Sequence, residues 1–511
     1  MTIRRGVSQL APDLDIVVIG AGPSGLAVTI ELEKQGLEVT VLEAGGLKPR
    51  ASGMAVDTVP EGRHAEPKIA ICEGLGGTSW WWGGRCVPPD PMDFRDWPIS
   101  QAELTPWYAA AAEFLGCGPV RFEADDLQGL DGVGFSALER WARTRELGRV
   151  WRAYLERRSR ISLCLEARVT ALKLNGNSVD INVSGRILRA GTVVVATGGL
   201  ASVKLLAGLP GISAALGKNY VGHTFGSVAD IIFADPQAAE AADFFLDRGS
   251  WARRRLTLPQ SCHIDERIMN VVFWPDNAAF HDWRHGSAVL SAVYLALSVP
   301  VVGRRLVSEA IRRRHVGAGG HVGKHLRNVL RDPAGLCRDA VRIVRQRYVE
   351  RPRRPGFLIR NRAGRYRLTF HGAQAVRADN RVTVDGERLK VAYDFSHDEA
   401  EAIVRAHEVL DESLRASGVG RLEWHTPPDK RVEAVLAQLG DGFHQQGLTR
   451  MGDDAAQAVV DRDCRLFGHE RIFVAGPGVL PTSGQANPTF AACALAMRLA
   501  HHIADAIRQR C

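Results

Sequence analysis

Three glycines near the start of the chain have the spacing of a phosphate-binding turn. Gly20, Gly22 and Gly25 follow the apolar run 16–19 in the pattern G-x-G-x-x-G, and a helical pattern continues over 26–35. In such a turn the first glycine permits the tight bend, the second lets the backbone approach a pyrophosphate, and the third lets helix and sheet pack closely. The free N–H groups at the start of the helix would face the same anion. This pattern predicts a dinucleotide site.

An acidic residue follows the next strand-like run. Glu43 comes directly after 38–42, where its carboxylate could accept hydrogen bonds from the hydroxyls of an adenosine ribose. The same charge would repel a 2′-phosphate, so NADP is not favoured. The alternative interpretation is a glycine turn in an ordinary βαβ unit that binds no ligand.

A long loop and a helical segment come next. Residues 71–100 are rich in glycine, proline and tryptophan, and loops of this length are uncommon without a function. Ser100 with Glu103 has the pattern of a capping box, which predicts a helical segment as far as Arg158.

The following runs predict a return to the first sheet. Strands are expected at 161–165, 169–174, 179–183, 186–188 and 192–196. A short helix is expected over 201–207. A domain that the chain leaves and re-enters must be discontinuous.

The middle of the chain has a different pattern. The runs 227–233, 268–273 and 381–384 predict an antiparallel sheet, and 287–350 is expected to be largely helical. Ser396 is expected to cap a helix that ends near Ala416. The end of the chain predicts one more buried strand, 471–475, and a closing helix, 488–508.

These elements predict an α/β protein. It has a Rossmann-like dinucleotide-binding domain and a second α+β substrate domain built on an antiparallel sheet. The predicted divisions are a nucleotide domain in three parts (12–99, 159–225 and 435–511), a helical segment (100–158) and a substrate domain (226–434).

Composition narrows the classes of protein. The chain has 511 residues, of which 45% are hydrophobic, so it can bury a large core. Its nine cysteines are scattered without a C-x-x-C pair, so we expect neither a disulfide framework nor a metal site. No signal-peptide pattern and no run of 18 apolar residues is present, so we expect a cytoplasmic protein, with a membrane-peripheral location as an alternative.

Positive charge is concentrated in one segment. Residues 304–354 contain 15 Lys and Arg against 4 acidic residues, although the net charge of the whole chain is only +8. Three interpretations stay open: a solvated helical face, an anionic membrane surface, and an acidic substrate or acidic carrier protein. Nucleic acid is not expected, because Tyr348 is the only aromatic residue among these charges.

Several motifs together resemble the glucose–methanol–choline (GMC) flavin oxidoreductases. IVVIGAGPSG with LEAGG resembles the FAD-binding start of that family, GGTSWWWGGRC its flavin-contacting loop, and ATGGLASVKLL its second FAD segment. HQQGLTRMG and FVAGPGVLPTSGQANPTFAACALAMRLA resemble its catalytic C-terminus. The resemblance covers both ends of the chain, about half its length, and implies FAD as the cofactor. Glycine-rich loops suit this cofactor, because a flat isoalloxazine needs close backbone approach.

The resemblance assigns roles to particular residues. His444 would act as the base that takes a hydroxyl proton, and Asn487 would hold the substrate hydroxyl. The cofactor-binding residues would be Gly20, Gly22, Gly25, Glu43, Gly77, Thr78, Trp81, Trp82, Gly83, Val169, Thr197, Gly476 and Pro488. The helix that starts at Pro488 would point toward the flavin.

Structural interpretations of these residues are also open. His444 could be an ordinary loop residue, Asn487 only a helix cap, and the tryptophans plain core residues. Trp81 stands where relatives with covalently attached FAD carry a histidine, which predicts non-covalent FAD here. Ala475 and Pro477 depart from the family pattern.

The resemblance implies oxidation of an alcohol group, on a sugar, aminosugar or other polyol, to a carbonyl by hydride transfer to the flavin. Oxygen or another electron acceptor would complete the cycle. A non-redox lyase that uses the same His444, and a non-catalytic docking protein built around 304–354, are the alternative functions.

Overall fold

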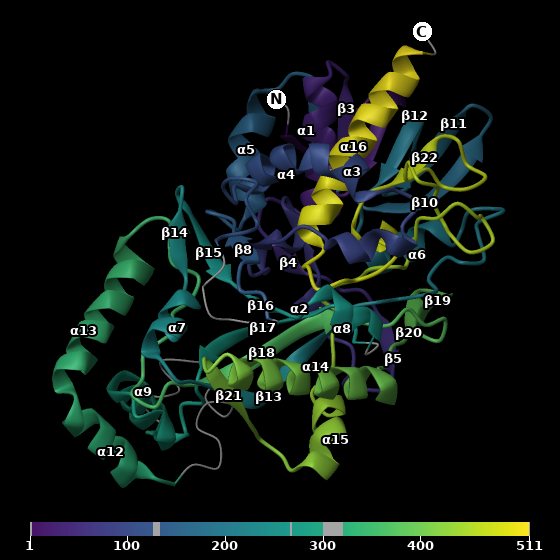
Figure 1. Cartoon of the computed structure of the whole chain (residues 1–511). Coiled ribbons are helices and arrows are strands. Elements are labelled where there is room, and N and C mark those ends of the chain that lie inside the picture. Colours follow the sequence, from purple (N-terminus) through teal and green to yellow (C-terminus); the bar gives the residue numbers. More distant parts are fainter. Residues whose placement is uncertain (1–2, 126–132, 266–267, 300–319, 510–511) are drawn as a thin grey trace.

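A computed structural model of the chain describes residues 3–125, 133–265, 268–299 and 320–509. Figure 1 shows two main bodies, with both termini on the upper one and an antiparallel sheet in the lower one. The part of the basic segment at 304–319, and the helix expected there, lie outside the described residues.

The first sheet is the Rossmann-like core. Its strand order is β1-β9-β3-β2-β12-β11-β10, and β22 pairs with β12. The strands are β1 (Ile3–Arg5), β2 (Asp13–Ile19), β3 (Val39–Leu42), β9 (Ile161–Leu165), β10 (Val169–Asn175), β11 (Ser178–Val183), β12 (Arg186–Val195) and β22 (Ile472–Val474). β1, β9, β3, β2, β12 and β22 are joined by parallel pairing, whereas β10 and β11 form an antiparallel hairpin extension. Three separate parts of the chain therefore build one sheet, which confirms the predicted fold class.

Two helices pack against this sheet and against each other. They are α1 (Pro23–Lys34) and the C-terminal α16 (Thr489–Arg508), with α4 (Tyr108–Leu115) beside α16. A Cβ atom on Gly25 would lie 2.0 Å from the carbonyl oxygen of Gly20, so this position in α1 requires glycine. The predicted role of Gly25 in close packing is confirmed. α6 (Gly199–Leu206) follows β12 at the position expected for the short helix.

The second sheet is antiparallel, as expected, but the run 381–384 is not part of it, because β19 (Arg381–Asp385) pairs with β20 (Arg388–Ala392) in a separate sheet. The order of the second sheet is β16-β17-β18-β13-β21, and α14 (His397–Ala416) runs along one side of it with α15 (Arg431–Leu436) (Figure 1). Its strands are β13 (His223–Phe233), β16 (Leu256–Thr257), β17 (Val271–Asn277), β18 (Arg365–Ala373) and β21 (Gly420–Trp424). Ser396 caps α14, because its hydroxyl accepts a hydrogen bond from the backbone N–H of Glu399 at 3.2 Å.

Two differences from the sequence expectations concern strands. The segment 100–158 contains α3 (Gln101–Leu104), α4 and α5 (Leu147–Arg157), but also the strand β8 (Leu138–Trp141). The segment expected to be helical is therefore helical in part. All four residues of β8 are buried, because the strand pairs on one side with β7 (Arg85–Cys86) and on the other with β15 (Ser250–Arg254). β18 was not expected either, although it lies at the centre of the second sheet.

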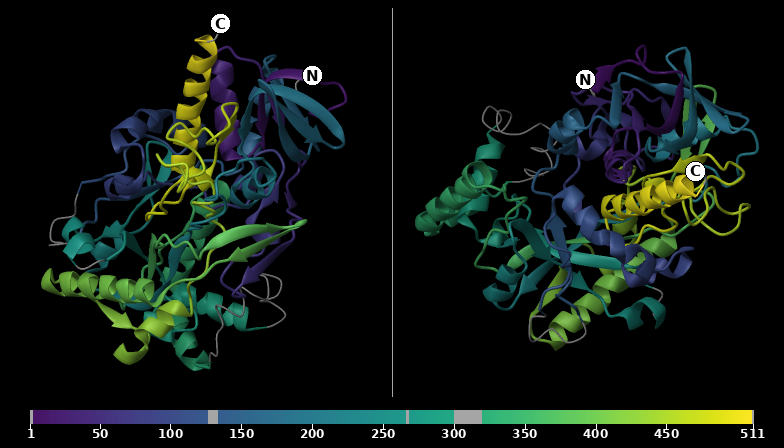
Figure 2. Two further views of the ribbon diagram at one scale, coloured as in Figure 1. Left: turned by 90° about the vertical axis from the view of Figure 1, so that its right-hand side faces the viewer. Right: turned by 90° about the horizontal axis from the view of Figure 1, so that it is seen from above.

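Smaller units complete the fold. β15 also pairs with β14 (Phe245–Asp247), β5 (Val56–Val59) joins β20 (Arg388–Ala392) and β19 (Arg381–Asp385), and β4 (Arg50–Ala51) pairs with β6 (Cys72–Glu73). Short helices are α2 (Pro67–Ala70), α7 (Pro236–Ala241) and α8 (Gln260–Asp265). The basic part of the chain forms α12 (Val322–Arg331) and α13 (Pro333–Val344), which lie against α9 (Ala288–Ser298). Figure 2 shows these helices at the periphery of the molecule.

One described helix, α16, is long and apolar enough to cross a membrane. About two thirds of its apolar window is buried inside the protein, at 67%. Its apolar residues pack against α1 and α4, so they are accounted for as core.

Candidate active site

One large cavity lies between the two sheets. Its volume is about 1490 Å³, and it is lined by the glycine turn of the first sheet as well as by His223, His371 and His444 from the region of the second. A site for a single small ligand usually has 300–1,000 Å³. This cavity therefore has room for a dinucleotide together with a substrate.

The glycine turn forms an open cradle in the cavity wall. Gly20 has a φ of +106°, in the region that favours glycine, and a Cβ there would meet the carbonyl oxygen of Ala196 at 2.5 Å. A Cβ on Gly22 would meet no heavy atom within 4 Å. Gly22, Pro23 and Ser24 line the cavity where α1 begins. A helix N-terminus with an open backbone approach fits a pyrophosphate.

Glu43 lies at the carboxyl end of β3 and is buried. Its Oε2 accepts a hydrogen bond from Ala21 N at 2.8 Å, and its Oε1 accepts from Gly45 N at 2.7 Å and Gly74 N at 3.0 Å. Burial raises the pKa of Glu43, and these N–H donors oppose that rise. The residue also lines the cavity, and a carboxylate has about four acceptor sites. It ties the loops of the cavity wall together and still has capacity for a ribose hydroxyl.

The loop after β6 packs directly on the glycine turn. Gly76 N donates to Ala21 O at 2.8 Å, and a Cβ on Gly77 would lie 2.8 Å from the Cα of Gly22. Trp81 is 41% exposed, so it is not a plain core residue. The indole N–H of Trp82 donates to Arg145 O at 2.8 Å. The loop is held in place by backbone contacts and presents its residues to the cavity.

The structure brings nearly all predicted site residues to this one cavity. Gly25 lies behind the turn, within the packing of α1 against the sheet. The remaining predicted residues all line the cavity: Gly20, Gly22, Glu43, Gly77, Thr78, Trp81, Trp82, Gly83, Val169, Thr197, Gly476, Pro488, His444 and Asn487.

His444 and Asn487 are directly hydrogen-bonded. Nδ2 of Asn487 lies 3.1 Å from Nε2 of His444, and the His444 side chain is 25% exposed. The residue that caps α16 is Pro488, and the Asn487 amide reaches His444 instead. Because an amide NH₂ only donates, Nε2 of His444 is the acceptor and carries no proton.

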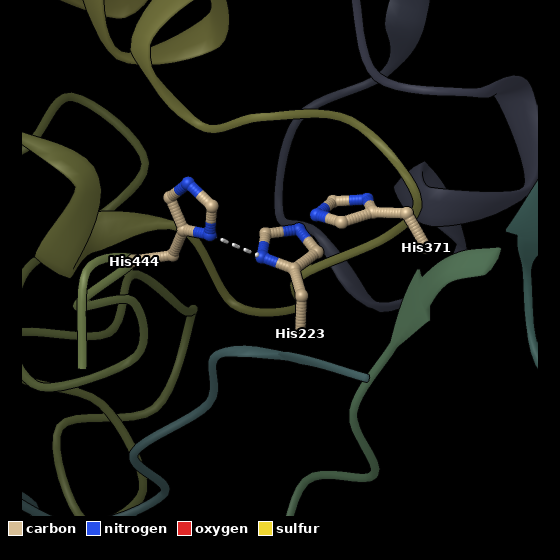
Figure 3. Close-up of side chains that lie close together, drawn as sticks. All are labelled: His223, His371 and His444. Carbon is tan, nitrogen blue, oxygen red and sulfur yellow. Dashed lines mark hydrogen bonds between the residues drawn. The ribbon is translucent and has the colours of Figure 1, made fainter. Parts of the chain in front are cut away.

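The other nitrogen of His444 contacts His223. Their Nδ1 atoms are 3.0 Å apart (Figure 3). Nε2 of His223 lies 3.1 Å from the carbonyl oxygen of Ala486. A carbonyl only accepts, so Nε2 of His223 carries that proton and its Nδ1 is the acceptor. The Nδ1 of His444 therefore donates, which agrees with an unprotonated Nε2 on the same ring.

A buried carboxylate lies beside this pair. Oδ2 of Asp441 is 3.3 Å from Nδ1 of His444 and accepts a hydrogen bond from His223 N at 2.8 Å. Burial alone would raise the pKa of Asp441, but His444 and His223 hold it well below its usual range. Asp441 is therefore an anion that can stabilise positive charge on the His444 ring.

His371, on β18, completes the group. Its ring stacks on that of His223 at a centroid distance of 4.3 Å, and its Nδ1 lies 3.0 Å from Gln485 O. Burial lowers the pKa of His223 and lowers that of His371 well below the usual range, so both stay neutral. The donor atoms of the three histidines lie within 4.8 Å of one another, close enough for one metal ion. The hydrogen bonds already account for the nitrogens of His223 and His444 and for Nδ1 of His371.

Sequence reasoning missed His223, His371 and Asp441. No local motif marked them, because His223 begins β13, His371 lies on an unexpected strand and Asp441 lies three positions before the start of the recognised motif. Only the folded chain brings them to His444.

Comparison with known proteins agrees with this geometry. The family model described as GMC oxidoreductase matches residues 376–496, and the model described as pyridine nucleotide-disulphide oxidoreductase matches residues 14–236. Pyridoxine 4-oxidase from Mesorbium loti has a similar fold, with a TM-score of 0.52 and 16% identity over 96% of this chain and 99% of that one.

Sequence relatives include sugar-modifying enzymes. C-glycoside 3-oxidase of Microbacterium trichothecenolyticum is 49% identical over 71 residues, 14% of each chain. The corresponding Arthrobacter globiformis oxidase is 37% identical over 102 residues, and the match spans 20% of this chain and only 19% of that protein. Paromamine 6′-oxidase of Streptomyces fradiae is 24% identical, with 97% of this chain and 92% of the relative covered.

The two family models match separate parts of the chain, 14–236 and 376–496. The N-terminal model covers most of the Rossmann-like sheet, and the C-terminal one contains His444 and Asn487. Residues 376–496 are therefore similar to GMC oxidoreductases, and the fold of the chain is similar to that of pyridoxine 4-oxidase.

Proposed function

We propose that the protein oxidises a CH–OH group of a small-molecule alcohol to a carbonyl, with FAD as its cofactor. The observation that carries this proposal is the unprotonated Nε2 of His444, held by Asn487 in the same cavity as the glycine cradle. When bound, FAD would accept the hydride that leaves the alcohol carbon.

His444 would take the hydroxyl proton at Nε2. The ring then carries a positive charge, and its Nδ1–H already lies 3.3 Å from the Asp441 carboxylate. This arrangement stabilises the charge as it forms, without movement of other groups. Nε2 has one lone pair, so the substrate hydroxyl would replace the Asn487 amide as its hydrogen-bond partner. The neutral Asn487 would then bind the hydroxyl oxygen while the proton moves to His444.

The cofactor is proposed to be FAD bound without a covalent link. Gly20, Gly22 and the N-terminus of α1 would hold its pyrophosphate, and Glu43 its ribose. Pro488 and Thr489 line the cavity at the N-terminus of α16, where the helix dipole favours negative charge on a reduced flavin. Trp81 has no side-chain nucleophile for covalent attachment. Acid precipitation should therefore leave the yellow cofactor in solution.

A sugar, aminosugar or other polyol is the proposed substrate class. The support comes from relatives that are named as C-glycoside 3-oxidases and a paromamine 6′-oxidase. Oxygen or another electron acceptor would reoxidise the flavin. The acidic substrate or carrier protein considered for the basic segment is not needed by this chemistry.

The test is anaerobic mixing of the flavin-loaded protein with glycosides, aminosugars and aliphatic alcohols, while flavin absorbance is followed. We expect bleaching by one substrate class and a 10²- to 10⁴-fold slower bleaching in His444→Ala. His501→Ala is the matched control, because that histidine lies on α16 and pairs with Glu31.

Two results would overturn the proposal. If the protein binds no FAD after purification or reconstitution, the proposed cofactor is wrong. A flavin that stays oxidised with every alcohol, while His444→Ala abolishes an elimination reaction, would support the non-redox lyase instead.

A further inference from the structure

Helix α12 presents apolar side chains outward and polar ones inward. Val322, Leu326 and Leu330 recur at every fourth position and so share one face. Each is 47–78% exposed. On the buried face, His325 Nδ1 lies 3.1 Å from Ser291 Oγ of α9, and Asn328 Nδ2 donates to the same oxygen at 3.1 Å. This is the reverse of the usual amphipathic surface helix.

Helix α13 and the turn that follows it also present apolar side chains outward. Leu336 and Ile343 face inward against a small apolar cluster under α9. Exposed large apolar residues continue along the outside at Val341, Val344, Tyr348 and Val349. Scattered single apolar residues on a surface are normal, but a concentration on two adjacent helices indicates an interaction site.

Free positive charges accompany these apolar residues. No carboxylate in the described part of the chain lies within ion-pair distance of Arg327, Arg331 or Arg338. Lys324 lies over the ring of Trp283 at 3.9 Å, which leaves its charge at the surface. Figures 1 and 2 show α12 and α13 at the outer edge of the molecule, beyond α9.

We propose that α12 and α13 dock the protein on the surface of an anionic membrane. The aliphatic side chains would enter the boundary between headgroups and acyl chains, and the arginines would contact lipid phosphates. Both kinds of contact are needed, because anionic lipid attracts basic residues and apolar burial adds to the affinity. Tyr348 suits such an interface, since tyrosine is enriched at the level of the headgroups.

A second copy of the chain fits this surface less well. A two-fold contact would bring the same face of each copy together, and thus the unpaired arginines against arginines. Dimerisation through this surface, or binding of an acidic protein to it, would contradict the proposal.

The experiment is sedimentation of the flavin-loaded full chain with phosphatidylcholine vesicles, with or without 30% phosphatidylglycerol. We expect binding to the anionic vesicles, weak binding to the neutral ones, and release at high salt. Arg327→Gln, Arg331→Gln and Arg338→Gln together should weaken binding about a hundredfold. Leu326→Gln with Leu330→Gln should weaken it at least tenfold.

Ile187→Gln is the matched control for the apolar change. Ile187 is exposed on β12 of the first sheet, which lies away from α12 and α13 in Figure 1, so its variant should bind as the native chain does. Flavin content reports whether each variant is folded. The proposal is wrong if anionic vesicles do not bind the native chain, or if the α12 variants bind them equally well. It is also wrong if those variants change only the monomer–dimer equilibrium.

Discussion

His223 and His444 face each other through their Nδ1 atoms, 3.0 Å apart, and only one of these nitrogens carries the shared proton. The carbonyl of Ala486 assigns the acceptor role to His223. His223 accepts the Nδ1 proton of His444, so Nε2 is the nitrogen of His444 that can act as a base.

His223→Leu should slow flavin reduction 10- to 100-fold, because His444 loses the acceptor for its Nδ1–H. His223→Asn should retain much of the native rate, since the amide oxygen can replace the lost acceptor. Stopped-flow reduction of flavin-loaded variants checks this. Equal losses in the two variants would show that His223 serves packing only.

Asp441→Asn tests the buried anion. Because the low pKa of Asp441 keeps it charged throughout the working range, its removal should make positive charge on His444 harder to form. We expect flavin reduction to be slower by up to about tenfold. The acidic limb of the pH–rate profile should move to lower pH. If the acidic limb does not move, Asp441 does not influence the proton transfer to His444.

Gly22→Ala and Gly25→Ala should behave differently. A Cβ on Gly22 enters open space, so the apoprotein should keep its melting temperature while FAD binds at least tenfold more weakly. A Cβ on Gly25 meets a backbone oxygen at 2.0 Å, so that variant should lose several kcal/mol of stability. Fluorescence titration with FAD and thermal unfolding of the apoproteins measure the two effects.

Asp93 should make stability depend on pH. Burial raises its pKa to about 7 in the folded chain, against 3.8 as the ordinary value, and the hydrogen bonds from Asn270 and Asp90 only partly oppose this. The stability that protonated Asp93 contributes to the folded chain is fully present below pH 3.8 and is lost as the pH rises through about 7. The melting temperature of Asp93→Asn, relative to the native chain, should therefore rise between pH 5 and 8. A constant difference would contradict the assigned burial effect.

The sequence was most informative where local backbone geometry determines function. The turn from Gly20 to Gly25 and the cap at Ser396 act within a few residues, so their patterns predicted the local structure. The ribose contact of Glu43 stays a prediction. Family resemblance supplied His444 and Asn487, and the structure shows that they touch.

The rest depends on contacts between distant segments. β18 carries arginines among its apolar residues, so its pattern is not that of a central strand, yet it pairs on both sides. His371 on this strand could not be predicted for the same reason. His223 and His444 come into contact only because the second sheet, which carries His223, lies next to the segment that carries His444.

This contact has an evolutionary consequence. His444 belongs to the part of the chain that rejoins the first sheet, whereas the strands that carry His223 and His371 belong to the second. We therefore expect that the predicted substrate domain, 226–434, cannot be exchanged as an independent unit. Replacement of residues 226–434 by those of a relative would change the residue at position 371 near the His444 ring. His223 lies outside this range and would be kept. We therefore expect changes of substrate preference to preserve the contacts among His223, His371 and His444.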